Sequence, residues 1–150
     1  MKKNDGTEVF HVTVDYTKSI AEMVRANNFD WVNNDVTDEH FPVKGSGQAE
    51  LEFKVHDFGG YINGEDAIAE ADKMGFRVAE PIEGLVFAVK YPDEQRKNPI
   101  VVLGSPWQFV DGIHFVLLLC ERGSKRRLTL LHVDGDGSWY RYCRFLLVRK

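Results

Sequence analysis

The sequence has only two cysteines, Cys120 and Cys143, and neither belongs to a CxxC motif or a Cys/His cluster. Structural zinc sites need four such ligands at short spacings, so we expect no zinc site. Two free, buried thiols are the favoured interpretation, because disulfides are rare in cytoplasmic chains. The chain also lacks a run of about 18 apolar residues, and we therefore expect no membrane span.

The first residues, 1–6, lack the apolar core of a signal peptide. This predicts cytoplasmic synthesis and leaves later delivery to a virion or cell surface open. A chain of 150 residues, 43% hydrophobic and 28% charged, has the size and composition of one globular domain with its own core. No internal repeat, low-complexity tract or linker divides it.

Charge is distributed unevenly along the chain. The net charge is −4, but residues 121–150 hold eight basic and three acidic residues and therefore carry +5. This basic end could attract an anionic partner. The favoured interpretation is that long cationic side chains flank exposed strand edges and oppose aggregation.

Hydrophobic periodicity predicts the order of secondary structure. Strands are expected over 8–16, 49–58, 99–104, 114–121, 127–133 and 144–149, and helices over 19–27, 64–74 and 82–90. Thr17 and Asn63 are the expected N-caps of the first two helices. The expected apolar helix faces are Ile20, Met23 and Val24; Ala67, Ile68, Ala71 and Met74; and Ile82, Leu85, Val86 and Val89. Residues 29–35 are expected to form a loop with aromatic anchors. Helices among early strands and strands alone at the end indicate an α+β fold with a largely antiparallel sheet.

A family resemblance rests on the order of elements from residue 49 onward. An Ala-rich acidic helix leads to Gly75-Phe76-Arg77, and a second helix and an apolar strand ending at Trp107 follow. A hairpin, a Gly-Ser-Trp turn and a closing strand over 144–149 complete the order. This resembles the C-type-lectin fold, and more narrowly the variable proteins of diversity-generating retroelements in episymbiotic bacteria, archaea and their viruses. The resemblance covers residues 49–150, so residues 1–48 would form an N-terminal strand–helix extension packed on the main fold.

The resemblance implies a ligand-binding display protein, the target protein of a retroelement, on a rigid scaffold with variable side chains near the C-terminus. Its partner would be a protein or another macromolecule, bound without a cofactor and without catalysis. Trp107 and Trp139 would stay constant, because the Trp codon contains no adenine to be mutated. The candidate ligand-binding residues are Phe109, Phe115, Thr129, Leu131, His132, Ser138, Tyr140 and Tyr142.

The residues themselves are compatible with such a surface. Tyr140 and Tyr142 share one face of an extended segment, and Tyr gives large, rigid contact area at low entropic cost. Calcium-dependent sugar-binding relatives use a Glu-Pro-Asn loop, whereas here Glu80-Pro81 precedes Ile82. We therefore expect no metal site and no sugar binding of that kind.

Two alternatives remain open at this point. Cys120 and Cys143 could form the active pair of a cysteine-dependent enzyme resembling formylglycine-generating enzymes, although the chain is much shorter than those proteins. Arg122 and the run Lys125-Arg126-Arg127 could instead contact nucleic acid, a less favoured partner. No histidine lies in a metal-binding motif such as HExxH.

Overall fold

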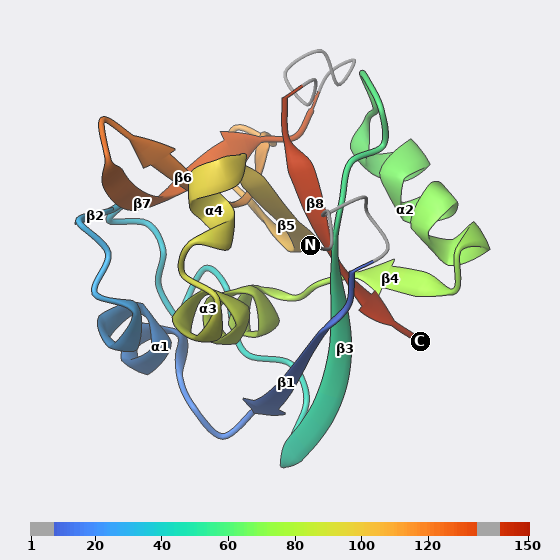
Figure 1. Cartoon of the computed structure of the whole chain (residues 1–150). Coiled ribbons are helices and arrows are strands. Elements are labelled where there is room, and N and C mark those ends of the chain that lie inside the picture. The colour runs from blue at the N-terminus through green and yellow to red at the C-terminus, as the bar shows by residue number, and fades with distance from the viewer. Residues whose placement is uncertain (1–7, 135–141) are drawn as a thin grey trace.

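The computed structural model describes residues 8–134 and 142–150, and in this part of the chain helices cover both faces of one sheet (Figure 1). The strands are β1 (Phe10–Asp15), β2 (Trp31–Val32), β3 (Gln48–His56), β4 (Phe76–Val78), β5 (Ile100–Gln108), β6 (His114–Arg122), β7 (Lys125–His132) and β8 (Arg144–Arg149). The helices are α1 (Ile20–Asn27), α2 (Gly64–Lys73), α3 (Pro81–Lys90) and α4 (Glu94–Lys97).

The strand order is β1-β3-β8-β5-β6-β7-β2, and β4 pairs with β8 outside this path. The pairs β5–β8 and β2–β7 are parallel, and the other pairs are antiparallel. The predicted α+β architecture with a mostly antiparallel sheet is therefore confirmed. The last strand, β8, lies between β3 and β5 inside the sheet, and residues before position 48 supply the two outer strands, β1 and β2.

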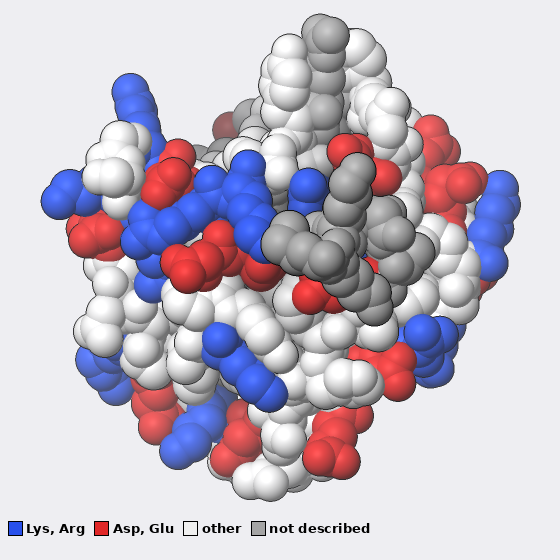
Figure 2. Space-filling model, in the orientation of Figure 1, with Lys and Arg blue, Asp and Glu red and all other residues white. Residues whose placement is uncertain are grey.

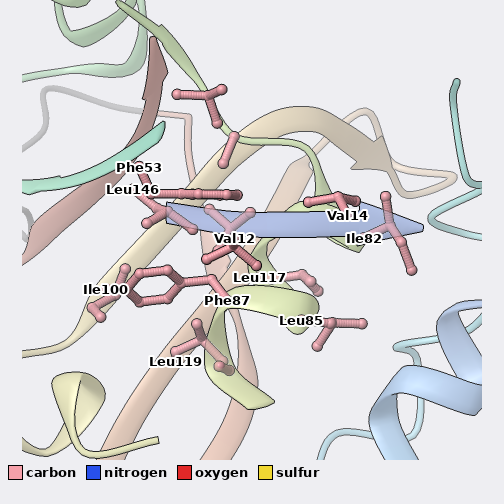
Figure 3. Packing of buried hydrophobic residues seen from close by; sticks show 14 of the residues in the cluster. Val12, Val14, Phe53, Ile82, Leu85, Phe87, Ile100, Leu117, Leu119 and Leu146 are labelled. Carbon is pink, nitrogen blue, oxygen red and sulfur yellow. The ribbon is translucent and has the colours of Figure 1, made fainter. Parts of the chain in front are cut away.

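Two hydrophobic clusters lie on opposite faces of this sheet. Alternate residues of β5 divide between them: Ile100 and Val102 pack beneath α1 and α3, whereas Val101 and Leu103 pack beneath α2. Figure 3 shows side chains from β1, β3, β5, β6 and β8 meeting those of α3 in the first cluster. Because β5 and β8 are covered on both faces, their sequences are continuous apolar runs rather than alternating ones.

The helix ends follow from their capping residues. Asn63 caps α2 as expected, accepting a bond from the backbone N–H of Asp66 (2.8 Å). The expected cap of α1 was wrong: Ser19, not Thr17, forms a reciprocal capping box with Glu22. Thr17 instead bonds the carboxylate of Asp15, which closes the turn after β1.

Two expected core positions on the helices were also wrong. Ile68 is 49% exposed and Val89 is exposed, whereas Phe87 and Ala88 are buried. A Cβ at Gly84 would lie 2.7 Å from Cγ2 of Val102, so α3 approaches β5 closely at that glycine. This contact sets the buried face of α3 and turns Val89 outward.

The region expected to be a loop over 29–35 contains the short strand β2, which pairs in parallel with Arg127 and Leu128 of β7. A two-residue strand has no periodicity to detect, so only tertiary pairing defines it. The β6–β7 hairpin was predicted and is confirmed; its turn residues Gly123 and Ser124 both have positive φ, which suits a tight hairpin.

Candidate functional site

A row of aromatic rings crosses three neighbouring strands where β5 ends. Trp107 of β5 pairs with Phe115 of β6, which pairs with His132 of β7. The ring centroids of both neighbouring pairs are 6.0 Å apart. Directly opposed residues of adjacent strands point to the same face, so we call these three residues the aromatic row.

Two further rings extend the aromatic row at Trp107. His40 stacks on the indole at 3.8 Å with an interplanar angle of 12°. Phe109 meets the same indole edge-to-face at 5.5 Å and leaves 43% of its own surface exposed. One indole thus joins the N-terminal segment to the end of β5, and it is itself only half-buried.

The turn between β5 and β6 presents an apolar tip. Val110, next to Phe109, is 94% exposed. The turn is closed by bonds from the Gly112 N–H to the Phe109 carbonyl (2.9 Å) and from the Phe109 N–H to the Ile113 carbonyl (2.8 Å). Asp111 accepts a further bond from the Ile113 N–H (3.0 Å). The tip is therefore an exposed apolar group on a braced backbone.

Asp134 joins the ends of β6 and β7 beside the aromatic row. Its carboxylate accepts the backbone N–H of His114 (2.6 Å) and lies 3.1 Å from Nδ1 of the same residue. The same carboxylate lies 3.4 Å from Nε2 of His132. These groups, the backbone N–H foremost, hold the pKa of Asp134 below its ordinary value. The ionised carboxylate therefore lies beside the imidazole that ends the aromatic row.

A cavity of about 450 Å³ lies around this sheet end, on the side of α2. Its wall includes Glu65, Glu80, Ser105 and Asp134. Ser105 has the uncommon positive φ of 48°, within a bulge of β5. Its hydroxyl donates to Oε1 of Glu80 (2.5 Å) and accepts from Nζ of Lys44 (2.8 Å). Backbone strain near a cavity is common at functional sites, and here it aims the hydroxyl at both partners.

A buried ionic network supports the helix beside this cavity. Glu83 of α3 is almost fully buried and pairs with Arg77 at 2.8 Å. The Tyr16 hydroxyl donates to the same carboxylate (2.5 Å), as does the backbone N–H of Glu80 (2.8 Å). Burial opposes ionisation of Glu83, but these bonds outweigh it and the pKa of Glu83 lies below its usual value. Burial and the bond to Glu83 raise the pKa of Tyr16 to about 12.

The structure brings together some of the residues that the sequence suggested for ligand binding. Phe109, Phe115 and His132 form one surface. Thr129 and Leu131 alternate with His132 along β7 and therefore face the opposite side of the sheet, where Leu131 packs on the cluster beneath α2. Thr129 and Leu131 are separated from His132 because alternate residues of one strand point to opposite faces of the sheet.

Of the last three of these positions, the structure describes only Tyr142. Tyr142 is 70% exposed and precedes β8, which starts beside Ile100, whereas the aromatic row lies where β5 ends. Ser138 and Tyr140 lie outside the described residues, as does Trp139. Tyr142 therefore lies away from the aromatic row.

Sequence reasoning did not assign two members of this surface, His40 and Val110. His40 lies in a connection with no periodicity, and only the fold places it against Trp107. Val110 carried a detectable signal, because an apolar residue beside Asp111-Gly112 in a turn has no core to enter.

Cys120 and Cys143 form no disulfide, as expected. Burial raises the pKa of Cys120, and burial together with the neighbouring charge of Cys120 raises that of Cys143 to about 11. Both thiols are therefore protonated at neutral pH, the less nucleophilic form.

In the described part of the chain, no three His, Cys, Asp or Glu side chains are grouped so that they could hold a metal ion. None of the helices described is both long and apolar enough to cross a bilayer. Comparisons with models of known protein families, with curated protein sequences and with solved structures found no match.

Proposed function

We propose that this protein binds a protein ligand through a surface made of Phe109, Val110 and the aromatic row. The carrying observation is the continuous set of rings from Trp107 to His132 beside a braced, apolar turn. Aromatic side chains dominate the energetics of protein interfaces because each one buries a large area at a small entropic cost. A preformed turn lowers the ordering cost of binding further.

The charges around this surface favour a protein over a nucleic acid. Glu39, Asp111 and Asp134 border it, and all three side chains are exposed. Carboxylates repel phosphates, but they suit a ligand that offers an apolar patch rimmed by Lys or Arg. An apolar centre within a polar rim is also the usual anatomy of a protein interface.

The proposal also covers the fold and the way in which the binding surface evolves. We regard the fold as C-type-lectin-like and the protein as the target of a diversity-generating retroelement, with Phe109, Phe115 and His132 as variable positions. Sequencing this gene in related genomes tests it. The expected result is variation of these three codons at positions where a near-repeat of the last third of the gene carries adenine, next to a reverse-transcriptase gene. Variation spread evenly over the gene contradicts this part.

The binding surface is tested by substitution at its exposed tip. The ligand is captured by cross-linking to the immobilised protein in a lysate of the source organism, then purified and titrated by calorimetry. Phe109→Ala is expected to weaken binding at least about tenfold, as for a residue at the centre of an interface. Its melting temperature should change little, because the side chain is half exposed.

Ile68→Ala is the matched control, because Ile68 is exposed to a similar extent on α2. It should bind like the unmodified protein. Equal affinities for all three proteins would show that the ligand binds elsewhere. Equal losses of affinity in Phe109→Ala and Ile68→Ala would show that the ligand binds by unspecific hydrophobic contact.

A further inference from the structure

The far end of the β6–β7 hairpin carries a second distinctive surface. Arg122 and Lys125 pair across the turn, and Arg127 follows on the same face. Trp31 of β2 pairs with Arg127, which places the indole beside these three cations. We call these four residues the hairpin patch. Arg126 points to the opposite face and is buried, so the run 125–127 does not act as one basic unit.

The cations of the hairpin patch differ in their ion pairing from the cations of α4, on the other side of the hairpin. Figure 2 shows blue side chains gathered around the hairpin and α4, mixed with red ones. On α4, Arg96 pairs with Glu121 and Asp93, and Lys97 pairs with Glu94. Within the described residues, Arg122, Lys125 and Arg127 have no carboxylate within 4 Å. Their charge is therefore available to an anion.

A stacking surface lies among these cations. The Trp31 side chain is 43% exposed, and the guanidinium of Arg127 lies 4.3 Å from its ring centroid. Both line a hollow of about 310 Å³ together with Arg122, Lys125 and Asp30. The Asp30 carboxylate already accepts the backbone N–H of Arg126 (2.8 Å). A flat ring and a flat guanidinium in a cationic hollow suit a ligand that is both planar and anionic.

We propose that the hairpin patch binds single-stranded nucleic acid. An unpaired base stacks on the indole or the guanidinium, and the phosphates on either side contact Arg122 and Lys125. A duplex fits less well, because its bases are already stacked on one another. The patch lies at the opposite end of β7 from the aromatic row, roughly 20 Å away at about 3.3 Å per residue, so it is independent of the proposed protein-binding surface.

The test measures binding of a fluorescently labelled 12-nucleotide thymidine strand to the full chain by fluorescence anisotropy. Trp31→Ala is expected to weaken binding about 5- to 150-fold, the range for loss of one base stacked on an aromatic ring. The two phosphate contacts, at Arg122 and Lys125, predict a slope of about −1.4 for log K against log salt concentration. Arg122→Ala and Lys125→Ala should each make this slope less steep by about 0.7.

Matched variants separate this site from unspecific attraction. Lys73→Ala removes an equal charge on α2 and should leave binding unchanged. Phe109→Ala, in the proposed protein-binding surface, should also leave it unchanged. Arg127→Lys keeps the charge and loses the planar group, and is expected to weaken binding without changing the slope. Equal losses in Lys73→Ala and Lys125→Ala would overturn the proposal. So would unchanged binding by Trp31→Ala, or binding to anionic phosphatidylserine vesicles in place of the strand.

Discussion

At the scale of single residues, close packing and buried charge fix side chains around the cavity. A Cβ on Gly104 would lie 2.5 Å from the Ala79 carbonyl oxygen, so this position accepts only glycine without a backbone shift. The neighbouring Glu83 carboxylate is buried, and it is stable there because Arg77 and Tyr16 both donate to it.

The raised pKa of Tyr16 predicts a loss of stability in alkali. Between pH 10 and about 12 the unfolded chain loses the phenol proton while the folded chain keeps it. The folded state then binds more protons, so its stability falls as the pH rises through this window and is fully present below it. Urea unfolding at pH 8 to 11 checks this.

Tyr16→Phe is the reference for that measurement, because it cannot ionise. The difference in unfolding free energy between the unmodified protein and Tyr16→Phe should be constant below pH 10 and shrink above it. A difference that does not change with pH would mean that Tyr16 is not protected from ionisation.

At the scale of elements, one buried arginine ties the hairpin to three helices. Arg126 of β7 donates to the Asn27 carbonyl at the end of α1 (2.7 Å), to the Ala88 carbonyl of α3 (3.5 Å) and to the Gln95 side chain of α4 (3.1 Å). It also stacks on Phe29 at 4.7 Å. Gln95 in turn donates to the Cys120 and Arg127 carbonyls, so α4 supports both strands of the hairpin.

Arg126→Ala is therefore expected to lower the free energy of unfolding by about 2–4 kcal/mol, because it leaves several buried acceptors without a donor. Chemical denaturation measures this. Lys125→Ala, the exposed neighbour, should change stability by less than about 0.5 kcal/mol. Similar effects of the two substitutions would show that Arg126 does not anchor the hairpin.

At the scale of the whole molecule, the last strand lies in the interior of the sheet. β8 pairs with β3, β4 and β5, and its four residues Phe145–Val148 are buried on both faces. The strands β1 and β2 lie at the two ends of the order. The interior of the sheet therefore depends on residues far apart in the sequence.

This arrangement predicts a gradient of protection in native-state hydrogen exchange. Amides of Leu146, Leu147 and Val148 should exchange only through global unfolding, and those of β2 through local opening at lower free energy. Mass spectrometry or NMR at increasing denaturant measures both. Equal protection in β2 and β8 would show that the edge strand opens only with the rest of the molecule.

The sequence by itself determined the local elements. Apolar runs marked β5 and β8, alternation marked β1 and β3, and Gly123 marked the hairpin turn, because strand period and turn conformation depend on neighbouring residues alone. Only the tertiary structure decided which of two adjacent arginines, Arg126 or Arg127, is buried, because that depends on helices supplied by distant segments. It also placed His40 on Trp107 and separated Tyr142 from the aromatic row, since sheet order is set by long-range pairing.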